Sequence, residues 1–285
     1  MVRNARSRFA GTTKLVFGAV LLTSFALATT RVHADAQEEL SNAVSAYGGI
    51  DVVNFINSGN VVVDPNTSIP FPKTIHIPSK IPVPDLTLIG VGVRTVSFLG
   101  IKVYSVAFYA DLNNPVLQVG TCFFVPICPT LTHEQIPQSA TPEAKIDHII
   151  KNTTCALRVI PTRGTSYSHL RDGFMRALQG RLVLAKKAGT LTPQEEREVQ
   201  PPLRKFKSMF PNSKPLEKHQ PLDLLFLAPM NGEPRNLIVR DLGSVQSDWL
   251  AQELLRAYFH EKGISPAVSP NMAPAFSAPD ALAPR

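Results

Sequence analysis

G-V-G-V-R-T-V-S-F-L-G-I-K-V-Y-S-V-A-F-Y-A-D occupies residues 90–111, and this stretch decides the fold of the 285-residue chain. Val, Ile, Phe and Tyr dominate it, and these residues favour β-strands over helix. Leu99 and Gly100 predict a tight turn between two antiparallel strands. With those two residues as the loop, Arg94 pairs with Ser105, so a guanidinium stands beside a hydroxyl on one face of the sheet.

Arg94 is the only charged residue in the first strand of this hairpin. A cation among apolar side chains loses several kcal/mol of hydration unless a partner or a ligand compensates it. One interpretation is an Arg at the sheet edge that pairs with a local carboxylate or carbonyl group. The other is a pocket for an anionic, largely apolar small molecule whose negative end Arg94 binds.

The composition is that of one globular domain with extensions, because 44% of the residues are hydrophobic and 18% are charged. The net charge is +7, but residues 1–34 contain five basic residues and no acid, so the rest of the chain carries only +2. A nearly neutral body lacks the basic face that phosphate binding requires, and we expect no nucleic-acid partner. The sequence also lacks the motifs of phosphate loops, dinucleotide-binding folds, serine hydrolases and zinc proteases.

The three cysteines are Cys122, Cys128 and Cys155, and they have no C-x-x-C spacing. This argues against both a zinc site and a complete disulfide framework. We interpret them as ordinary thiols. A small-loop disulfide between Cys122 and Cys128 is the alternative in an oxidising compartment.

The N-terminus resembles a targeting segment over residues 1–34. Four basic residues precede the uncharged, mainly apolar residues 15–30, and the first acidic residue is Asp35. An Arg-rich, acid-free start is typical of a mitochondrial presequence, and residues 15–30 could anchor the protein in the inner membrane with its domain in the intermembrane space. Secretion is the alternative, because the residues before Asp35 suit signal peptidase and because glycosylation sequons begin at Asn66 and Asn152.

The remainder of the chain divides into three parts. Residues 35–74 become rich in Asn, Val and Pro, which indicates a tether. Residues 75–266 form the main domain, and the Pro-, Ala- and Ser-rich residues 267–285 form a disordered tail. Prolines restrict residues 73–83 to an edge strand or an extended arm.

Hydrophobic spacing predicts helices and strands in the main domain. We expect a strand at 154–161 and a long helix from about Ser168 that stops at Gly189. A capping box at Thr192 predicts a second, charged helix. The other expected elements are a short helix after Thr141, a strand pair at 222–228 and 236–240, and a helix at 244–262. Strands, then helices, then strands indicate an α+β layer fold.

Several motifs resemble those of one family. Residues 90–94, followed by a Gly turn and a strand that ends in Tyr and an acid, resemble the N-terminal hairpin of the chalcone isomerase superfamily. Residues 152–176, 221–227 and 249–266 are similar to its fungal mitochondrial branch, which includes the family named for altered inheritance of mitochondria. The resemblance covers residues 75–266. It implies an open-faced β-sandwich, in which a layer of helices covers a large antiparallel sheet and the ligand cleft lies between them.

The resemblance also implies site residues. In flavonoid-making members a strand Arg steadies the negative charge that develops on the substrate, and Arg94 corresponds to it through the G-V-R motif. The strand hydroxyl of the family matches either Tyr104 or Ser105, and the expected pairing with Arg94 favours Ser105. Tyr167 and the serine after it fit the start of the central helix, although a Tyr there often only packs locally. Phe174 replaces the Asn of the enzymes, which argues against a flavanone-forming enzyme.

We therefore interpret the chain as a binding module for an apolar ligand with an anionic end that Arg94 holds. Tyr104, Ser105, Tyr167 and Phe174 are its expected neighbours at the ligand. Non-catalytic relatives suggest a fatty acid or haem. An isomerase or intramolecular lyase on another substrate, with Arg94, Tyr167 and Ser105 as catalytic residues, is the alternative, and a vestigial cleft in a structural protein is a third.

Haem is the one candidate cofactor, and it requires an axial ligand such as His. Of the seven histidines, only His169 is expected near the mouth of the cleft, because it lies two residues after Tyr167. No metal site is expected otherwise. The same helix carries the basic residues Arg171, Arg176, Arg181, Lys186 and Lys187, which we interpret as a solvated face, with acidic lipid or a partner as the alternative.

Overall fold

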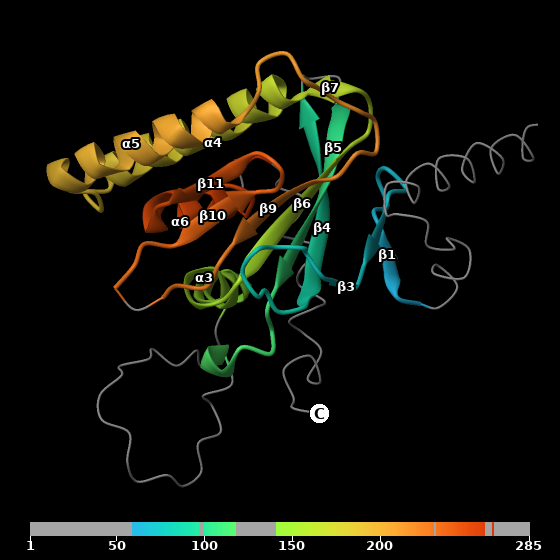
Figure 1. The fold of residues 1–285 in the computed structure, drawn as a ribbon, viewed down its shortest axis with the longest axis horizontal. Helices are drawn as coiled ribbons and strands as arrows, with labels where there is room; N and C mark the ends of the chain where they lie inside the picture. The colour runs from blue at the N-terminus through green and yellow to red at the C-terminus, as the bar shows by residue number, and fades with distance from the viewer. Residues whose placement is uncertain (1–58, 97–99, 118–140, 231, 260–263, 265–285) are drawn as a thin grey trace, which may run out of the picture.

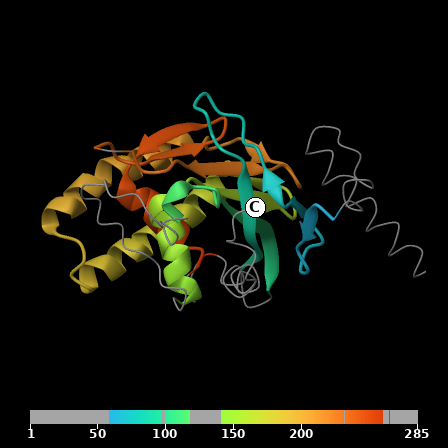
Figure 2. The same cartoon turned by 90° about the horizontal axis from the view of Figure 1, so that it is seen from below.

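The computed structural model describes residues 59–96, 100–117, 141–230, 232–259 and 264 of the chain. An antiparallel sheet has seven strands in the order β11-β10-β9-β6-β5-β4-β3. These strands are β3 (Thr74–Ile75), β4 (Leu86–Val96), β5 (Ile101–Ala110), β6 (Cys155–Pro161), β9 (Leu222–Phe226), β10 (Asn236–Val239) and β11 (Gly243–Gln246). Four helices gather on one side of the sheet: α3 (Pro142–Asn152), α4 (Tyr167–Lys187), α5 (Pro193–Met209) and α6 (Asp248–Arg256) (Figures 1 and 2).

Smaller elements complete the fold. They are the hairpin of β1 (Val61–Val63) and β2 (Pro70–Pro72), the pair of β7 (Thr165–Ser166) and β8 (Pro215–Leu216), and a 3-10 turn at Pro115–Leu117. The β1–β2 hairpin lies on the side of the sheet away from the helices (Figures 1 and 2). The sheet is thus the middle layer, as expected for an α+β fold.

Each face of the sheet covers its own apolar cluster. Alternate residues of β5 and β6 point to opposite faces, so Phe108 and Leu157 pack under the helices, while Tyr109 and Ile160 pack on the other side. The cluster under the helices is the larger one. Burial on both faces explains why β6 is apolar except at Arg158, which forms a buried ion pair with Asp223 of β9 at 2.7 Å.

The central hairpin forms as predicted, but its register differs. Val96 pairs with Ile101, so the loop between the paired strands is longer than the two residues expected. A register shift between Arg94 and Thr95 then sets Arg94 opposite Tyr104. The prediction that Arg94 faces Ser105 is therefore wrong. The length of the loop and the bulge together fix the register of the two strands. Neither of them can be predicted from the strand propensity of the residues.

The predicted helices begin and end close to the expected residues. Thr141 caps α3, Ser166 caps α4, and Thr192 forms a capping box with Glu195 at the start of α5. Gly189 follows α4 with φ +68°, a conformation that favours glycine. Local side-chain chemistry thus placed these boundaries correctly.

The prediction of a helix at 244–262 is wrong at its start, and α6 also ends earlier than expected, at Arg256. Gly243–Gln246 forms β11, which pairs with β10, and the helix begins only at Asp248 after the cap residue Ser247. Val245 therefore packs from an edge strand. The available edge of β10 decides this, because a short apolar run is compatible with either structure until a pairing partner is present.

Part of the predicted tether packs against the domain. Ile69 and Phe71 are buried in the cluster beneath the sheet, and β3 occupies the sheet edge within the segment 73–83 that was expected there. Asp64 is also fully buried, and it accepts hydrogen bonds from Ser105 Oγ at 2.6 Å and Thr67 Oγ1 at 2.9 Å. These contacts fasten the β1–β2 hairpin to β5.

Two polar clusters tie the C-terminal part to α3. The guanidinium of Arg235 is almost fully buried and donates to the backbone carbonyls of Leu227, Ile150 and Thr153. Asp147 accepts from Lys151 at 2.9 Å and from Arg256 at 2.6 Å.

Several predictions lie outside the described residues. They concern the targeting segment 1–34 with its apolar part 15–30, the tail 267–285, most of the connection 112–142, and Cys122 and Cys128. Cys155 is a buried free thiol. Among the helices in the described ranges, none is long and apolar enough to cross a membrane.

Candidate functional site

A cavity of about 800 Å³ lies where the β4–β5 hairpin meets the first half of α4. Its apolar wall consists of Val96, Val103, Leu170 and Met175, together with the ring of Tyr104. Its polar lining is Arg94, Arg163, Thr165, His169, Asp172, Arg176, Gln179 and Lys207, and Gly164 and Gly173 complete it. The volume falls in the range of small-molecule sites in proteins.

Arg94 lies on the floor of this cavity because the register of β4 turns it toward the helices. The guanidinium Cζ lies 5.8 Å from the ring centre of Tyr104, and Nη1 donates to Tyr104 Oη at 3.4 Å. Gly173 of α4 provides the room. A Cβ at position 173 would lie only 3.1 Å from Arg94 Nη1, closer than nearly all Cβ contacts in proteins.

Arg94 has no carboxylate partner among the residues that the structure describes. Burial by itself lowers the pKa of Arg94, whereas the oxygens of Tyr104 and Tyr258 raise it by more, so its pKa lies above the usual value. The guanidinium therefore stays charged and has donors available for an incoming anion.

Two buried tyrosines support the guanidinium. The hydroxyls of Tyr104 and Tyr258 share a hydrogen bond of 3.1 Å. Burial raises the pKa of Tyr104 despite the opposing effect of Arg94, and burial followed by the nearby Tyr104 raises the pKa of Tyr258 well above 10.0. Both phenols are consequently protonated at neutral pH. Tyr104 accepts the hydrogen bond from Arg94, and Tyr258 fixes the hydroxyl of Tyr104.

The mouth of the cavity is cationic. Three exposed basic side chains, those of Arg163, Arg176 and Lys207, line it, against the single carboxylate of Asp172, which itself pairs with Arg171 at 2.9 Å. The rest of the lining includes an apolar surface formed by Val96, Val103, Leu170 and Met175. An anionic group with an apolar body matches this distribution of charge and apolar surface.

The family assignment follows from this chain's match to a known family model. Residues 84–273, two thirds of the chain, match the model described as "Chalcone isomerase like". The chain belongs to the chalcone isomerase-like family. The α+β fold with its large antiparallel sheet, predicted from the hairpin of residues 90–111, is thereby confirmed.

Curated relatives of this chalcone isomerase-like protein come from yeasts. An uncharacterized protein of Schizosaccharomyces pombe is 34% identical over 129 residues, which is 45% of this chain and 46% of the relative. "Altered inheritance of mitochondria protein 18, mitochondrial" of Kluyveromyces lactis is 25% identical over 147 residues, or 45% and 47% of the two chains. The protein of the same name from Eremothecium gossypii is 25% identical over 187 residues, or 61% and 55%. The chain thus spans about half the length of the curated relatives it matches.

A solved structure shares the fold. The crystal structure of a fatty-acid binding protein of Arabidopsis thaliana superposes with a TM-score of 0.54 at 22% sequence identity, covering 76% of this chain and 98% of the plant protein. At this identity the likeness supports the fold of the chalcone isomerase-like domain.

The structure brings together some of the predicted site residues and separates others. Arg94 and Tyr104 line the cavity, as does His169. Ser105 points to the opposite face of the sheet, toward Asp64, because successive residues of β5 alternate between faces.

Two predicted residues of α4 lie near the cavity but not in its lining. Tyr167 is 5% exposed and packs in the core, with Lys214 Nζ 5.5 Å from its ring centre. Phe174 is fully buried among Phe206 and Phe210, at ring distances of 6.2 and 6.0 Å. Both side chains contribute to packing in the structure.

Other residues of the site, which line the cavity or contact its lining, were missed from the sequence. Only Gly173 could have been noticed in the sequence. A glycine inside a predicted helix often marks a place where another group packs closely against the helix. Lys207 and Tyr258 belong to α5 and to the turn after α6, and nothing in their local sequence connects them with Arg94.

Proposed function

We propose that this protein is a binding module for an apolar small molecule with an anionic end, and that a long-chain fatty acid is the best candidate. The observation that carries the proposal is the charged guanidinium of Arg94, held by Tyr104 beside the apolar wall of the cavity and without a carboxylate partner in the described ranges. The fatty-acid binding protein of Arabidopsis thaliana, which shares the fold, supports this choice.

The ligand would enter with its carboxylate toward Arg94. A hydrogen bond to a charged group contributes about 1.5–3 kcal/mol, which corresponds to roughly tenfold to hundredfold in Kd. The acyl chain would contact Val103, Leu170 and Met175, and burial of each methylene contributes about 0.8 kcal/mol. Affinity should therefore rise with chain length until the cavity is filled.

Titration of the full chain with oleate and with methyl oleate, by calorimetry, tests the proposal. The wild type should prefer the acid by about tenfold or more, and Arg94→Met should remove this preference while binding the ester as before. Arg240→Met is the matched control, because Arg240 is exposed and does not line the cavity. An unchanged preference for the acid in Arg94→Met would refute the role of Arg94.

Haem is the second candidate ligand, because His169 lines the same cavity and can supply an axial nitrogen. Arg163, Arg176 and Lys207 at the mouth suit its propionates. Haem titration should then give a Soret band that His169→Ala shifts or abolishes. A band unaffected by His169→Ala would remove the observation that favours haem.

An isomerase activity would require a hydroxyl beside the cation, and Tyr104 provides the one in contact with Arg94. Turnover of an enone substrate that is lost in both Arg94→Met and Tyr104→Phe would favour the enzyme over the binding module. Absence of turnover across a broad enone panel would count against it.

We also propose a mitochondrial location. It is supported by the acid-free, basic N-terminal residues 1–34 and by the names of the yeast relatives. A fluorescent protein fused behind residues 1–34 should co-localise with mitochondria. Secretion instead predicts a glycan at the exposed Asn66, and its detection by mass spectrometry in the native protein would overturn the mitochondrial assignment.

A further inference from the structure

A simple fatty acid leaves three cations of the cavity without an anion. Arg163, Arg176 and Lys207 line the cavity together with Arg94, and all three are exposed. A fatty acid has a single carboxylate, and in the proposed complex Arg94 binds it. The other three basic side chains then face the same cavity with no negative group of the ligand to meet.

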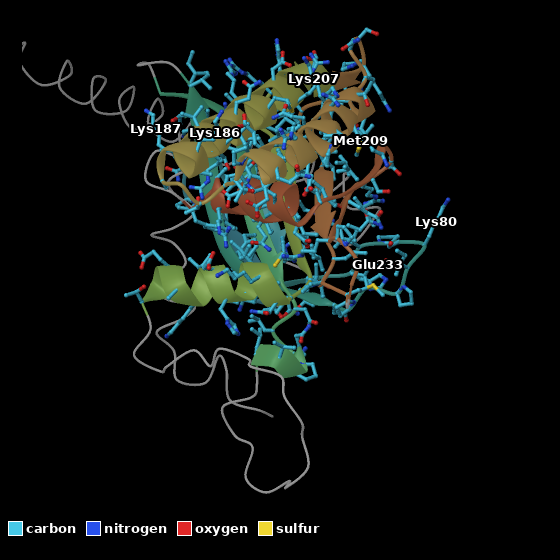
Figure 3. The ribbon with its side chains drawn as sticks, turned by 90° about the vertical axis from the view of Figure 1, so that its left-hand side faces the viewer. Lys80, Lys186, Lys187, Lys207, Met209 and Glu233 are labelled. Carbon is cyan, nitrogen blue, oxygen red and sulfur yellow. The ribbon has the colours of Figure 1, made fainter. Side chains whose placement is uncertain are left out.

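The three cations come from different parts of the fold. Arg163 lies between β6 and β7, Arg176 lies in α4, and Lys207 lies in α5. Figure 3 shows Lys207 on the upper side of the helical pair, apart from Lys186 and Lys187. A solvated helix face would carry its basic residues on one element, whereas here each of three elements contributes one to the lining of a single cavity. Convergence of polar groups from separate elements is typical of a binding site.

The protein itself provides little negative charge at this place. Among the described residues, none of the three cations forms an ion pair. The one carboxylate of the lining is that of Asp172, which pairs with Arg171 at 2.9 Å. The hydrogen bond from Arg171, and then the charges of Lys207 and Arg176, lower the pKa of Asp172, so it is ionised. With Asp172 counted, four basic groups against one acidic group give the lining a net charge of +3.

We infer that the preferred ligand carries a negative group at each end of its apolar body, as an α,ω-dicarboxylate does. The inference rests on the proposed function and deepens it by naming the class of ligand. Arg94 holds the first carboxylate on the floor of the cavity, and Arg163, Arg176 and Lys207 form a second subsite for the other carboxylate at the mouth. Guanidinium groups suit this task because they donate paired hydrogen bonds to a carboxylate.

The exposure of the second subsite limits its strength. An ion pair in contact with water changes an affinity by up to about fivefold. The same cations also attract any anion toward the cavity and so accelerate the association of monoacids and diacids alike. A subsite therefore has to be measured as a difference in Kd between ligands that differ only in the second charge.

Calorimetric titration of the full chain with diacids and their monomethyl esters measures this difference. Octanedioate, dodecanedioate and hexadecanedioate cover a range of lengths, and each ester has the same chain with one charge fewer. The wild type should prefer the diacid by about fivefold or more at the length that fits. The preference should differ between lengths, because two groups of cations at fixed positions accept a limited range of separations. No preference at any length, or the same preference at all three, would overturn the inference.

Two triple variants with the same loss of charge locate the subsite. Arg163→Gln/Arg176→Gln/Lys207→Gln should bind each diacid no better than its ester. The control is Arg197→Gln/Arg204→Gln/Lys205→Gln, which changes three exposed basic residues of α5 that do not line the cavity. This control should keep the preference for the diacid. Equal loss of the preference in both variants would refute the subsite, because it would show a general attraction to a positive surface.

The oleate titration separates this inference from the proposed function. Binding of oleate that depends on Arg94, without a preference for any diacid, would overturn the inference alone. Absence of binding of oleate and of every diacid would overturn the proposed function, and the inference with it.

Discussion

Replacement of Gly173 by alanine should weaken ligand binding while it stabilises the fold. Gly173 lies in the interior of α4, where glycine costs about 0.5–1 kcal/mol relative to alanine because of backbone entropy. A methyl group at this position, however, meets the guanidinium of Arg94, at 3.1 Å from Nη1 and 3.4 Å from Cζ and Nη2. The end of the Arg94 side chain must therefore move by a few tenths of an ångström.

The substitution should therefore raise the thermal stability of the fold and lower its affinity for the ligand. The gain in helix propensity should raise the midpoint of thermal unfolding by about 2–4 °C for a domain of this size, if Arg94 moves at little cost. The same movement disturbs the bond from Nη1 to Tyr104 and misaligns the donors that would meet the anion. Loss of roughly 1 kcal/mol of a charge-assisted hydrogen bond should raise the Kd for oleate about fivefold.

Gly180→Ala on the same helix is the matched control. Nothing lies within 4 Å of a Cβ at position 180, so this change brings the propensity gain without touching Arg94. Calorimetric titration with oleate and thermal unfolding of both variants give the comparison. Equal oleate affinity of Gly173→Ala and Gly180→Ala would refute the reasoning, because it would mean that the position of the guanidinium does not matter for binding.

Three further predictions concern the stability of the fold. Ser105→Ala should cost about 1–3 kcal/mol of unfolding free energy in denaturant titration, because the buried Asp64 loses a donor, yet leave the oleate Kd unchanged. Arg235→Met should cost roughly 3 kcal/mol or more, since three buried carbonyl groups lose their donor, whereas the partly exposed Arg240→Met should cost less than about 1 kcal/mol. Burial raises the pKa of Asp147, but its two basic neighbours lower it by more, to below the ordinary 3.8. Its stabilising effect is therefore present above about pH 3.8 and is lost as the pH falls through the lower folded value, so Asp147→Asn should be destabilising at neutral pH and nearly neutral in strong acid. A difference in unfolding free energy between the wild type and Asp147→Asn that persists at the lowest pH would contradict this prediction.

Local chemistry explains the parts of the fold that the sequence predicted. The β-branched and aromatic residues of 90–111 form a hairpin because their propensity and the central turn act over neighbouring residues. The capping side chain of Thr192 and the glycine at 189 define helix ends through bonds and dihedral angles within a few residues. Arg94 was identified for the same reason, since a lone cation in an apolar strand is visible without tertiary information.

The register, the edge strand and the site composition could not be predicted in the same way. A bulge at Arg94 decides that Tyr104, rather than Ser105, is its partner, and the two residues lie on opposite faces of β5. Residues 243–246 become a strand because β10 offers an open edge. Both outcomes depend on which backbone groups find a partner elsewhere in the chain.

The sequence by itself determined the sheet-forming hairpin, the capped starts of α3, α4 and α5, and the presence of one cation in need of a partner. Only the tertiary structure decided what surrounds that cation. Gly173 leaves it room, Tyr258 supports its partner tyrosine, and Lys207 adds charge at the mouth, although these residues are far from Arg94 in the sequence. Hydration loss, hydrogen bonding and van der Waals contact depend on distances in space, and sequence separation does not encode these distances.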